Sequence, residues 1–371
     1  MHLARYAAAT VLVLTLAACS DDEPEATPEP STSTSTSTST SPSTSPSSSA
    51  ATSTPSPSES PSRPTAARLD WQAVDGPVSD SVTRNADWTL TVVGNGKGWS
   101  LDGPRGSFGE RSSDRRVSDA LLDERWAVVV LQDPTESQPS RAEVTDLRTG
   151  DTFTIDGSSE VPTTNGGTWA LGGDRLLHAT VGPGRAYCVA TVDLTDRASE
   201  LAWCAPKRHG FNGGHLTPGG TSVLSFDAGR PSCRTLMAID GAEATPFEGV
   251  EECAAWDGLL TEDGQVWSVI VDERRIEQAR FHATTGGEET DLGPGVAGSL
   301  TWCGDAAWFV RDPKKEGDPA ALMRWSPADG LDVAYESPGG QAFLSEPRCG
   351  GDQITVTALA EDGDEQVTAR L

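Results

Sequence analysis

Two stretches with one shared pattern decide the fold: LTPGGTSVLSF at residues 216–226 and LTEDGQVWSVI at residues 260–270. Each joins a tight turn, rich in Gly, Pro and Asp, to a short run in which apolar and polar residues alternate. Alternation with a period of two is typical of a β-strand with one buried face. From residue 66 onward no segment keeps a helical period over three turns, so the sequence predicts an all-β domain.

The strand of these two stretches recurs at a regular interval. The starts of the recurring strands lie 38, 49, 46, 44, 41 and 47 residues apart, which leaves room for about four strands in each repeat. This period predicts a β-propeller of seven blades, with six or eight blades or a pair of β-sandwiches as the alternatives. The recurring strands are residues 88–93, 126–130, 175–181, 221–226, 265–271, 306–310 and 353–357.

The last repeat is one strand short. After residue 353 the sequence has room for two strands only, near residues 354–359 and 366–371. Residues 68–74 precede the first repeat, and we expect them to supply the missing outer strand. Such closure would protect strand edges that an open sheet would expose.

The turns before the recurring strands resemble the Ser-Pro-Asp-Gly turn of WD-like and TolB-like propeller repeats. The resemblance spans most of residues 66–371, although the Gly-His and Trp-Asp pairs of true WD repeats are absent. It implies a propeller fold and carries no information about activity.

The N-terminus carries an export signal. Arg5 is followed by an apolar run over residues 6–16, and the run ends in Leu16-Ala17-Ala18-Cys19. This pattern resembles the lipobox of bacterial lipoproteins. The resemblance implies cleavage after Ala18, transfer of a diacylglyceryl group to the Cys19 thiol, and anchoring at the extracytoplasmic face of the cell membrane. The alternative is an ordinary secretory signal with a chance cysteine.

Composition sets the expected domain boundaries. Residues 31–62 are almost wholly Ser, Thr and Pro, which cannot bury enough apolar surface to offset the entropy of ordering. We therefore expect a signal peptide at residues 1–18, a lipidated Cys19 with a disordered tether at residues 19–65, and the propeller at residues 66–371.

The charge of the chain excludes one class of partner. The formal net charge is −27, and residues 66–371 carry −23 of it. A domain this acidic repels nucleic acid and anionic headgroups. We therefore expect no nucleic-acid partner, and we expect the lipid rather than surface charge to hold the protein at the membrane.

Six cysteines follow Cys19, with no Cys-x-x-Cys pair, and an even number in an exported protein predicts three disulfides. The repeat pattern favours one pairing. Cys188 and Cys204 are equally far from a hairpin turn centred on Asp196, and Cys303 and Cys349 occupy the same place in consecutive repeats. The remaining pair is Cys233 with Cys253.

Searches for catalytic motifs fail. The sequence has no Gly-x-Ser-x-Gly, His-Glu-x-x-His, Walker or calcium-loop motif, so it predicts no catalytic residue, metal or cofactor. His209 and His215 flank a glycine-rich stretch, and we interpret them as loop histidines, with a metal or general-base role as the alternative. The acidic run at residues 361–365 is interpreted as a solvated turn rather than a calcium site.

Charge differs between the two sets of strand connections in repeats one to six. The loops between second and third strands sum to a formal charge of zero, whereas the turns between third and fourth strands sum to −10. In a propeller these sets lie on opposite faces, which we call the loop face and the turn face. We expect the loop face to bind an envelope protein or an anionic ligand. Its candidate residues are Lys97, Arg141, Arg185, Arg230, Arg274, Arg275, Lys314 and Lys315.

The sequence thus favours a lipid-anchored, non-enzymatic binding module of the cell envelope. Two other functions stay open: a hydrolase or lyase that acts on envelope glycans, and a solute-binding or sensory module. The enzyme would need a cluster of titratable side chains in the central channel.

Overall fold

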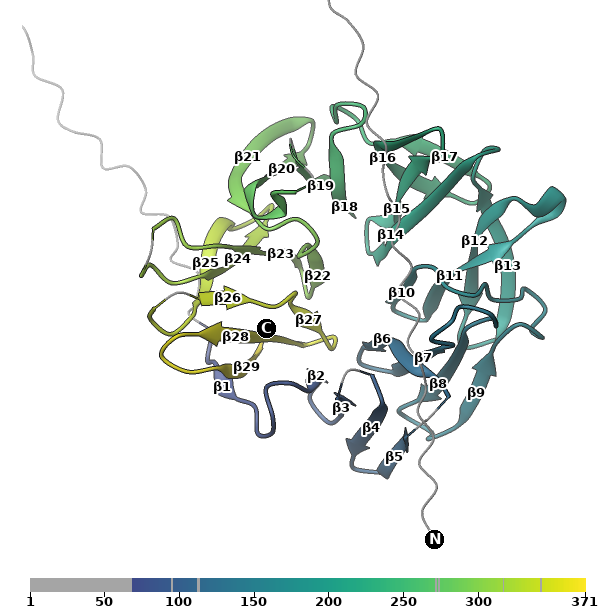
Figure 1. The fold of residues 1–371 in the computed structure, drawn as a ribbon, viewed down its shortest axis with the longest axis horizontal. Helices are drawn as coiled ribbons and strands as arrows, with labels where there is room; N and C mark the ends of the chain where they lie inside the picture. Colours follow the sequence, from purple (N-terminus) through teal and green to yellow (C-terminus); the bar gives the residue numbers. More distant parts are fainter. Residues whose placement is uncertain are drawn as a thin grey trace, which may run out of the picture. The chain divides into compact units, whose positions relative to one another are not determined.

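The computed structural model describes residues 69–94, 96–111, 114–270, 272, 274–315, 317–340 and 342–371. Seven antiparallel sheets form a ring (Figure 1). The chain is a seven-bladed β-propeller, as the spacing of the recurring strand predicted. In this part of the chain the helical elements are the short 3-10 turns η1 (Pro183–Arg185) and η2 (Ile276–Gln278), and there is no α-helix.

Blades 1 to 6 each consist of four consecutive strands, and the first strand of each blade is the innermost. Their strands are β2 (Ser81–Arg84), β3 (Thr89–Val93), β4 (Gly98–Gly103) and β5 (Gly106–Arg111); β6 (Arg116–Leu122), β7 (Trp126–Gln132), β8 (Arg141–Asp146) and β9 (Thr152–Ile155); β10 (Trp169–Gly172), β11 (Arg175–Val181), β12 (Tyr187–Asp193) and β13 (Ala198–Cys204); β14 (His209–Thr217), β15 (Gly220–Asp227), β16 (Arg230–Asp240) and β17 (Glu243–Pro246); β18 (Ala255–Thr261), β19 (Gly264–Val269), β20 (Ala279–Thr285) and β21 (Glu288–Gly295); and β22 (Thr301–Cys303), β23 (Ala306–Arg311), β24 (Ala321–Ser326) and β25 (Gly330–Glu336).

Blade 7 closes the ring with strands from both ends of the propeller. Its innermost strand is divided into β26 (Ala342–Leu344) and β27 (Arg348–Cys349), which both pair with β28 (Gln353–Ala360). Next comes β29 (Glu365–Arg370), and β1 (Gln72–Ala73) pairs with β29 as the outermost strand. The expected contribution of residues 68–74 to the last blade is therefore confirmed, although the paired segment is only two residues long.

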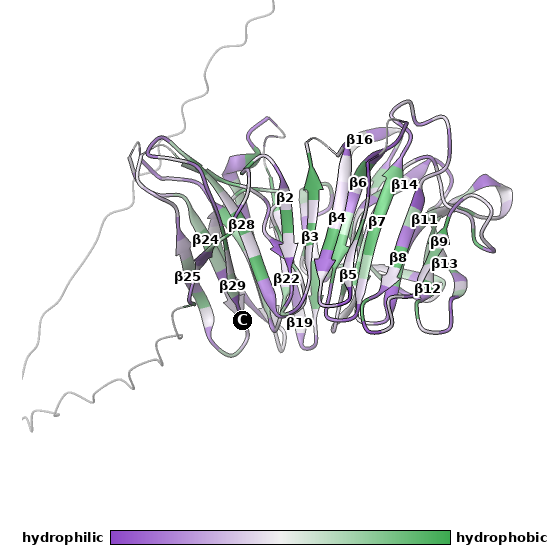
Figure 2. Ribbon diagram, turned by 90° about the horizontal axis from the view of Figure 1, so that it is seen from below, coloured by the Kyte–Doolittle hydropathy of each residue, from purple (hydrophilic) through white to green (hydrophobic). Residues whose placement is uncertain are grey.

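The recurring strand of the sequence is the second strand of every blade. In the edge view of Figure 2, β3 and β7 are largely hydrophobic. The apolar residues of these second strands pack between neighbouring blades. Leu90, Val128 and Leu176, for example, are fully buried on these strands. The alternation of side chains sends one set of residues into each of the two neighbouring interfaces.

Three disulfides are present, and they are the pairings that the repeat pattern predicted. Cys188 and Cys204 lie opposite each other on β12 and β13, and Cys233 on β16 bonds Cys253 just before β18. Cys303 bonds Cys349, which joins the innermost strands of blades 6 and 7. Cys19 and the signal peptide lie outside the described residues, so lipidation stays a prediction. No helix in the described part of the chain is long and apolar enough to cross a membrane.

Candidate functional site

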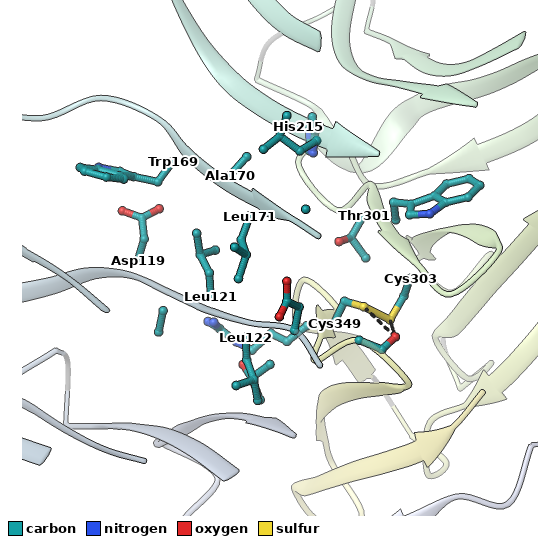
Figure 3. A pocket seen from close by; sticks show the side chains of 18 of the residues that line it. Asp119, Leu121, Leu122, Trp169, Ala170, Leu171, His215, Thr301, Cys303 and Cys349 are labelled. Atoms are coloured by element: carbon teal, nitrogen blue, oxygen red, sulfur yellow. Dashed lines mark hydrogen bonds between the residues drawn. A yellow bond between two sulfur atoms is a disulfide. The ribbon is translucent and has the colours of Figure 1, made fainter. Parts of the chain in front are cut away.

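A cavity of about 830 Å³ lies along the central channel of the propeller (Figure 3). The innermost strands of blades 1, 2, 3, 4, 6 and 7 all contribute residues to its lining. This volume is within the range of about 300–1,000 Å³ that is usual for small-molecule sites.

The charged residues of the lining are mostly acidic. Four carboxylates line the cavity, against one arginine, Arg348. The guanidinium of Arg348 donates a hydrogen bond to the hydroxyl of Ser81, with 3.2 Å between Nη2 and Oγ. The four acidic residues are Asp119, Asp123, Glu124 and Glu346.

Irregular backbone accompanies the titratable groups of the innermost strands. The pairing of β6 with β7 shifts register between Val117 and Asp119, and the pairing of β14 with β15 shifts between Asn212 and His215. A third shift, in β18, brackets Asp257. Such bulges redirect side chains and are frequent next to binding sites.

Blade 7 is irregular in another way, because its innermost strand is broken at residues 345–347. Pro347 has no backbone N–H and cannot donate to the neighbouring strand. Glu346 and Pro347 lie in this break, and both line the cavity.

Two of the lining carboxylates and the buried Asp257 occupy the same place in the repeat. Asp119, Asp257 and Glu346 each lie seven residues before the second strand of their blade, which begins at Trp126, Gly264 and Gln353. None of the three belongs to a motif that the sequence offers on its own. Alignment of the repeats on the recurring strand was the signal that could have found them.

Electrostatics links the three acids. Burial raises the pKa of Asp119, and the Ser118 side chain and Arg348 oppose this shift. Burial also raises the pKa of Glu346, where repulsion from Asp119 adds to the shift and Arg348 opposes it. Burial also raises the pKa of Asp257 to about 7, and the nearby Glu346 adds to this shift. Asp257 does not line the cavity. Its Oδ2 accepts hydrogen bonds from the Gly298 amide (2.7 Å) and the Ser268 hydroxyl (3.1 Å).

The interpretation of His209 and His215 as loop residues was wrong. Both belong to β14, the innermost strand of blade 4, and His215 lines the cavity. Burial lowers the pKa of His215 to about 4, so its imidazole is neutral at pH 7. Figure 3 shows Asp119, His215 and Thr301 around the cavity, each from a different blade.

Aromatic residues complete the lining. Trp169 is 6% exposed and stacks on His178, with 5.2 Å between the ring centroids. Trp302 also lines the cavity, and its buried indole Nε1 has no hydrogen-bond partner among the described residues. The site can therefore offer carboxylate acceptors, one guanidinium and the surfaces of two indoles.

The eight candidate residues of the loop face are all exposed. They lie in the connections between second and third strands, or at the first residue of the third strand, in blades 1 to 6. None of the eight lines the cavity. Arg141 pairs with Glu143 at 2.7 Å and Arg275 with Glu277 at 3.5 Å. The structure thus places these residues on one face, distributed around the ring rather than gathered in one pocket.

Metal-ligating residue types gather once in the described ranges, at Cys233, Glu252 and Cys253. The two cysteines form a disulfide, so neither offers a thiolate. Residues 361–364 form the turn between β28 and β29, as expected.

Comparison with known proteins supports the fold only. No protein-family model matches the sequence, and no curated protein is significantly similar to it. The β-propeller domain of the trilobed protease from Pyrococcus furiosus, described as having an open velcro topology, has a TM-score of 0.52 at 9% identity, over 78% of this chain and 94% of that one. At this identity the similarity shows a common propeller fold and no shared activity.

Two further solved propellers have lower TM-scores. Oligogalacturonate lyase from Vibrio parahaemolyticus has a TM-score of 0.48 at 10% identity, over 82% of this chain and 97% of that one. TolB from Acinetobacter baumannii has a TM-score of 0.39 at 11% identity, over 79% of each chain. Scores at this level support no statement about function.

Proposed function

We propose that this protein is an exported, lipid-anchored binding module that takes a positively charged ligand into its central channel and releases it unchanged. The observation that carries the proposal is the placement of Asp119 and Glu346 at irregular points of two innermost strands, both facing one cavity. Bulges and strand breaks cost ladder hydrogen bonds, so their coincidence with these acids favours a functional role.

The charge of the lining determines the ligand class. Four carboxylates stand against one arginine whose guanidinium is already bonded to Ser81, and His215 is neutral. A bound cation would relieve the repulsion between Asp119 and Glu346. The sequence predicted an anionic partner at the loop face, whereas the channel favours a cation, so the two surfaces are separable in experiments.

The position of Leu69, the first described residue, supports an outward-facing loop face. Gln72 pairs with Thr368, so Leu69 is level with Leu371 at the end of β29. The backbone amide of Leu371 donates a hydrogen bond to the backbone oxygen of Asp352 (2.9 Å), which lies in the turn between the first and second strands of blade 7. The first described residue therefore lies at the turn face, opposite the loop face. Binding of an envelope component at the loop face remains our second proposed contact.

Calorimetric titration of the full chain with three oligosaccharides of equal length tests the ligand class. The probes are the tetramer of glucosamine (cationic), the tetramer of N-acetylglucosamine (neutral) and tetragalacturonate (anionic). We expect binding of the glucosamine tetramer only, weaker at low pH where Asp119 and Glu346 become protonated. Binding of the anionic tetramer alone, or of none of the three, would contradict the proposal.

A glycan-active hydrolase is the second candidate function. Two carboxyl groups with raised pKa values in one cavity can act as general acid and general base. New reducing ends after prolonged incubation with the glucosamine tetramer, abolished in Glu346→Gln, would establish the enzyme. Intact tetramer at saturating occupancy would support the binding module.

A further inference from the structure

Six of the seven blade interfaces are apolar, and the seventh is not. Each of the six clusters of buried apolar side chains joins two consecutive blades, from blades 1 and 2 to blades 6 and 7. In the described part of the chain, no such cluster joins blade 7 to blade 1, where the two ends of the ring meet. We call this interface the seam.

The alternation of side chains in blade 7 produces the difference. Val356 and Val367 point toward blade 6 and belong to its apolar cluster. The residues next to them on β28 and β29 point the other way, toward blade 1, and are polar although they are buried. These residues are Thr355 (1% exposed), Gln366 (6%) and Thr368 (5%).

Hydrogen bonds hold the seam together. Gln366 donates from Nε2 to the backbone oxygen of Asp80 at 3.2 Å, and Arg348 donates to Ser81. When a seam of this kind opens, water replaces the lost partners, whereas an opened apolar cluster would expose hydrophobic surface without compensation. Opening is therefore least costly at the seam.

A solvent-open pocket lies beside the seam. This second cavity, of about 240 Å³, lies under the connection of residues 74–80 on the blade 1 side. Its lining includes Val82, Thr89 and Thr91 of blade 1. Exposed residues such as Asp75 and Pro77 form part of its lining, so solvent reaches this face of blade 1 beside the seam.

We propose that the native ring opens at the seam and that this opening is a side entrance to the central channel. Ser81 and Arg348 belong both to the seam and to the channel lining, so their separation exposes the channel from the side. Residues 74–80 still connect β1 to β2, which limits the opening to a hinge motion. The inference concerns the ring itself and holds whatever the channel binds.

Cysteine labelling of the full chain tests the opening with a matched pair on one strand. Thr355 and Val356 are adjacent on β28 and each 1% exposed, but Thr355 faces the seam and Val356 faces the apolar cluster with blade 6. The variants Thr355→Cys and Val356→Cys are incubated with N-ethylmaleimide under native conditions, and labelling at each site is followed by peptide mass spectrometry. Global unfolding would label both sites at the same rate, whereas opening of the seam labels only the first.

We expect Thr355→Cys to react at least tenfold faster than Val356→Cys. A second pair, Thr368→Cys and Ala369→Cys on β29, repeats the comparison if either first variant fails to fold. Equal rates within a folded pair, or faster labelling on the blade 6 side, would overturn the proposal.

Discussion

Cys303 and Cys349 form a disulfide between the innermost strands of blades 6 and 7, at the ends where these strands turn toward the second strands. Hydrogen bonds occupy the corresponding place in two other interfaces. Asn85 donates to the backbone oxygen of Asp123 at 2.6 Å between blades 1 and 2. Thr217 donates to that of Leu260 at 2.6 Å between blades 4 and 5. The interface of blades 6 and 7, which is adjacent to the seam, therefore has a covalent bond where these two interfaces have a hydrogen bond.

Removal of this disulfide should destabilise the propeller more than removal of the one within blade 3. The Cys303–Cys349 bond closes 46 residues and Cys188–Cys204 closes 16. We expect the Cys303→Ala, Cys349→Ala double variant to lose about 3–4 kcal/mol, roughly 1 kcal/mol more than Cys188→Ala, Cys204→Ala. Urea unfolding of both variants measures this difference, and a larger loss for the blade 3 pair would rule out the loop-length explanation.

Asp257 should make stability depend on pH. Burial raises its pKa from 3.8 to about 7, so the folded protein keeps a proton that the unfolded chain releases. The resulting stabilisation is complete below pH 3.8 and is lost as the pH rises through 7. Asp257→Asn has no group to titrate at this position. We therefore expect its free energy of unfolding, relative to that of the wild type, to rise by on the order of 2 kcal/mol from pH 5 to pH 8.

Thermal or urea unfolding across this pH range provides the comparison for Asp257. Asp123, whose pKa burial raises to about 6, contributes equally to both curves. Parallel curves for wild type and variant would show that Asp257 is ionised in the folded protein at neutral pH.

The two-residue strand β1 should depend on Trp71 for its attachment. The Trp71 indole donates to the backbone oxygen of Ala334 at 2.8 Å and packs on the Tyr335 ring, with 5.1 Å between centroids. We expect Trp71→Ala to cost about 2–3 kcal/mol, below the usual range for a fully buried Trp because Trp71 is half-buried. Trp71→Phe keeps a ring and should cost about 1 kcal/mol. Equal urea midpoints for wild type and Trp71→Ala would mean that β1 does not stabilise the closed ring.

The fold could be predicted because its signals are local. A turn of Gly, Asp or Pro followed by alternating residues identifies each second strand from a dozen residues alone, and the regular spacing then gives the number of blades. The disulfide pairing followed from the same repeat, since Cys303 and Cys349 hold equivalent places in consecutive blades.

The channel site could not be predicted in the same way, because bulges depend on pairing between strands. Residues 209–215 contain three glycines, and the loop interpretation rested on them. In the structure a Cβ on Gly210 would lie 2.5 Å from the Phe226 ring, and one on Gly214 would lie 2.9 Å from Leu177. These glycines allow close packing of a strand rather than flexibility.

Lipidation of Cys19 is tested by fractionation. We expect Cys19→Ser to lose acyl labelling completely and to move from the membrane fraction to the soluble fraction, because a thiol is required for the thioether. The wild-type protein should remain with the membranes in the same preparation. A Cys19→Ser protein that still sediments with membranes would show that another feature anchors the chain.

The most direct test of the account compares the channel with the loop face in one titration. The glucosamine tetramer is titrated into the wild type, into the channel variant Asp119→Asn, Glu346→Gln, and into the loop-face variant Arg185→Glu, Arg230→Glu, Arg274→Glu. If the ligand binds in the channel, the channel variant should bind at least tenfold more weakly, because each neutralised acid removes a charged hydrogen-bond acceptor. The loop-face variant should bind as the wild type does. Full affinity in the channel variant together with lost affinity in the loop-face variant would contradict the account and place the binding site on the loop face.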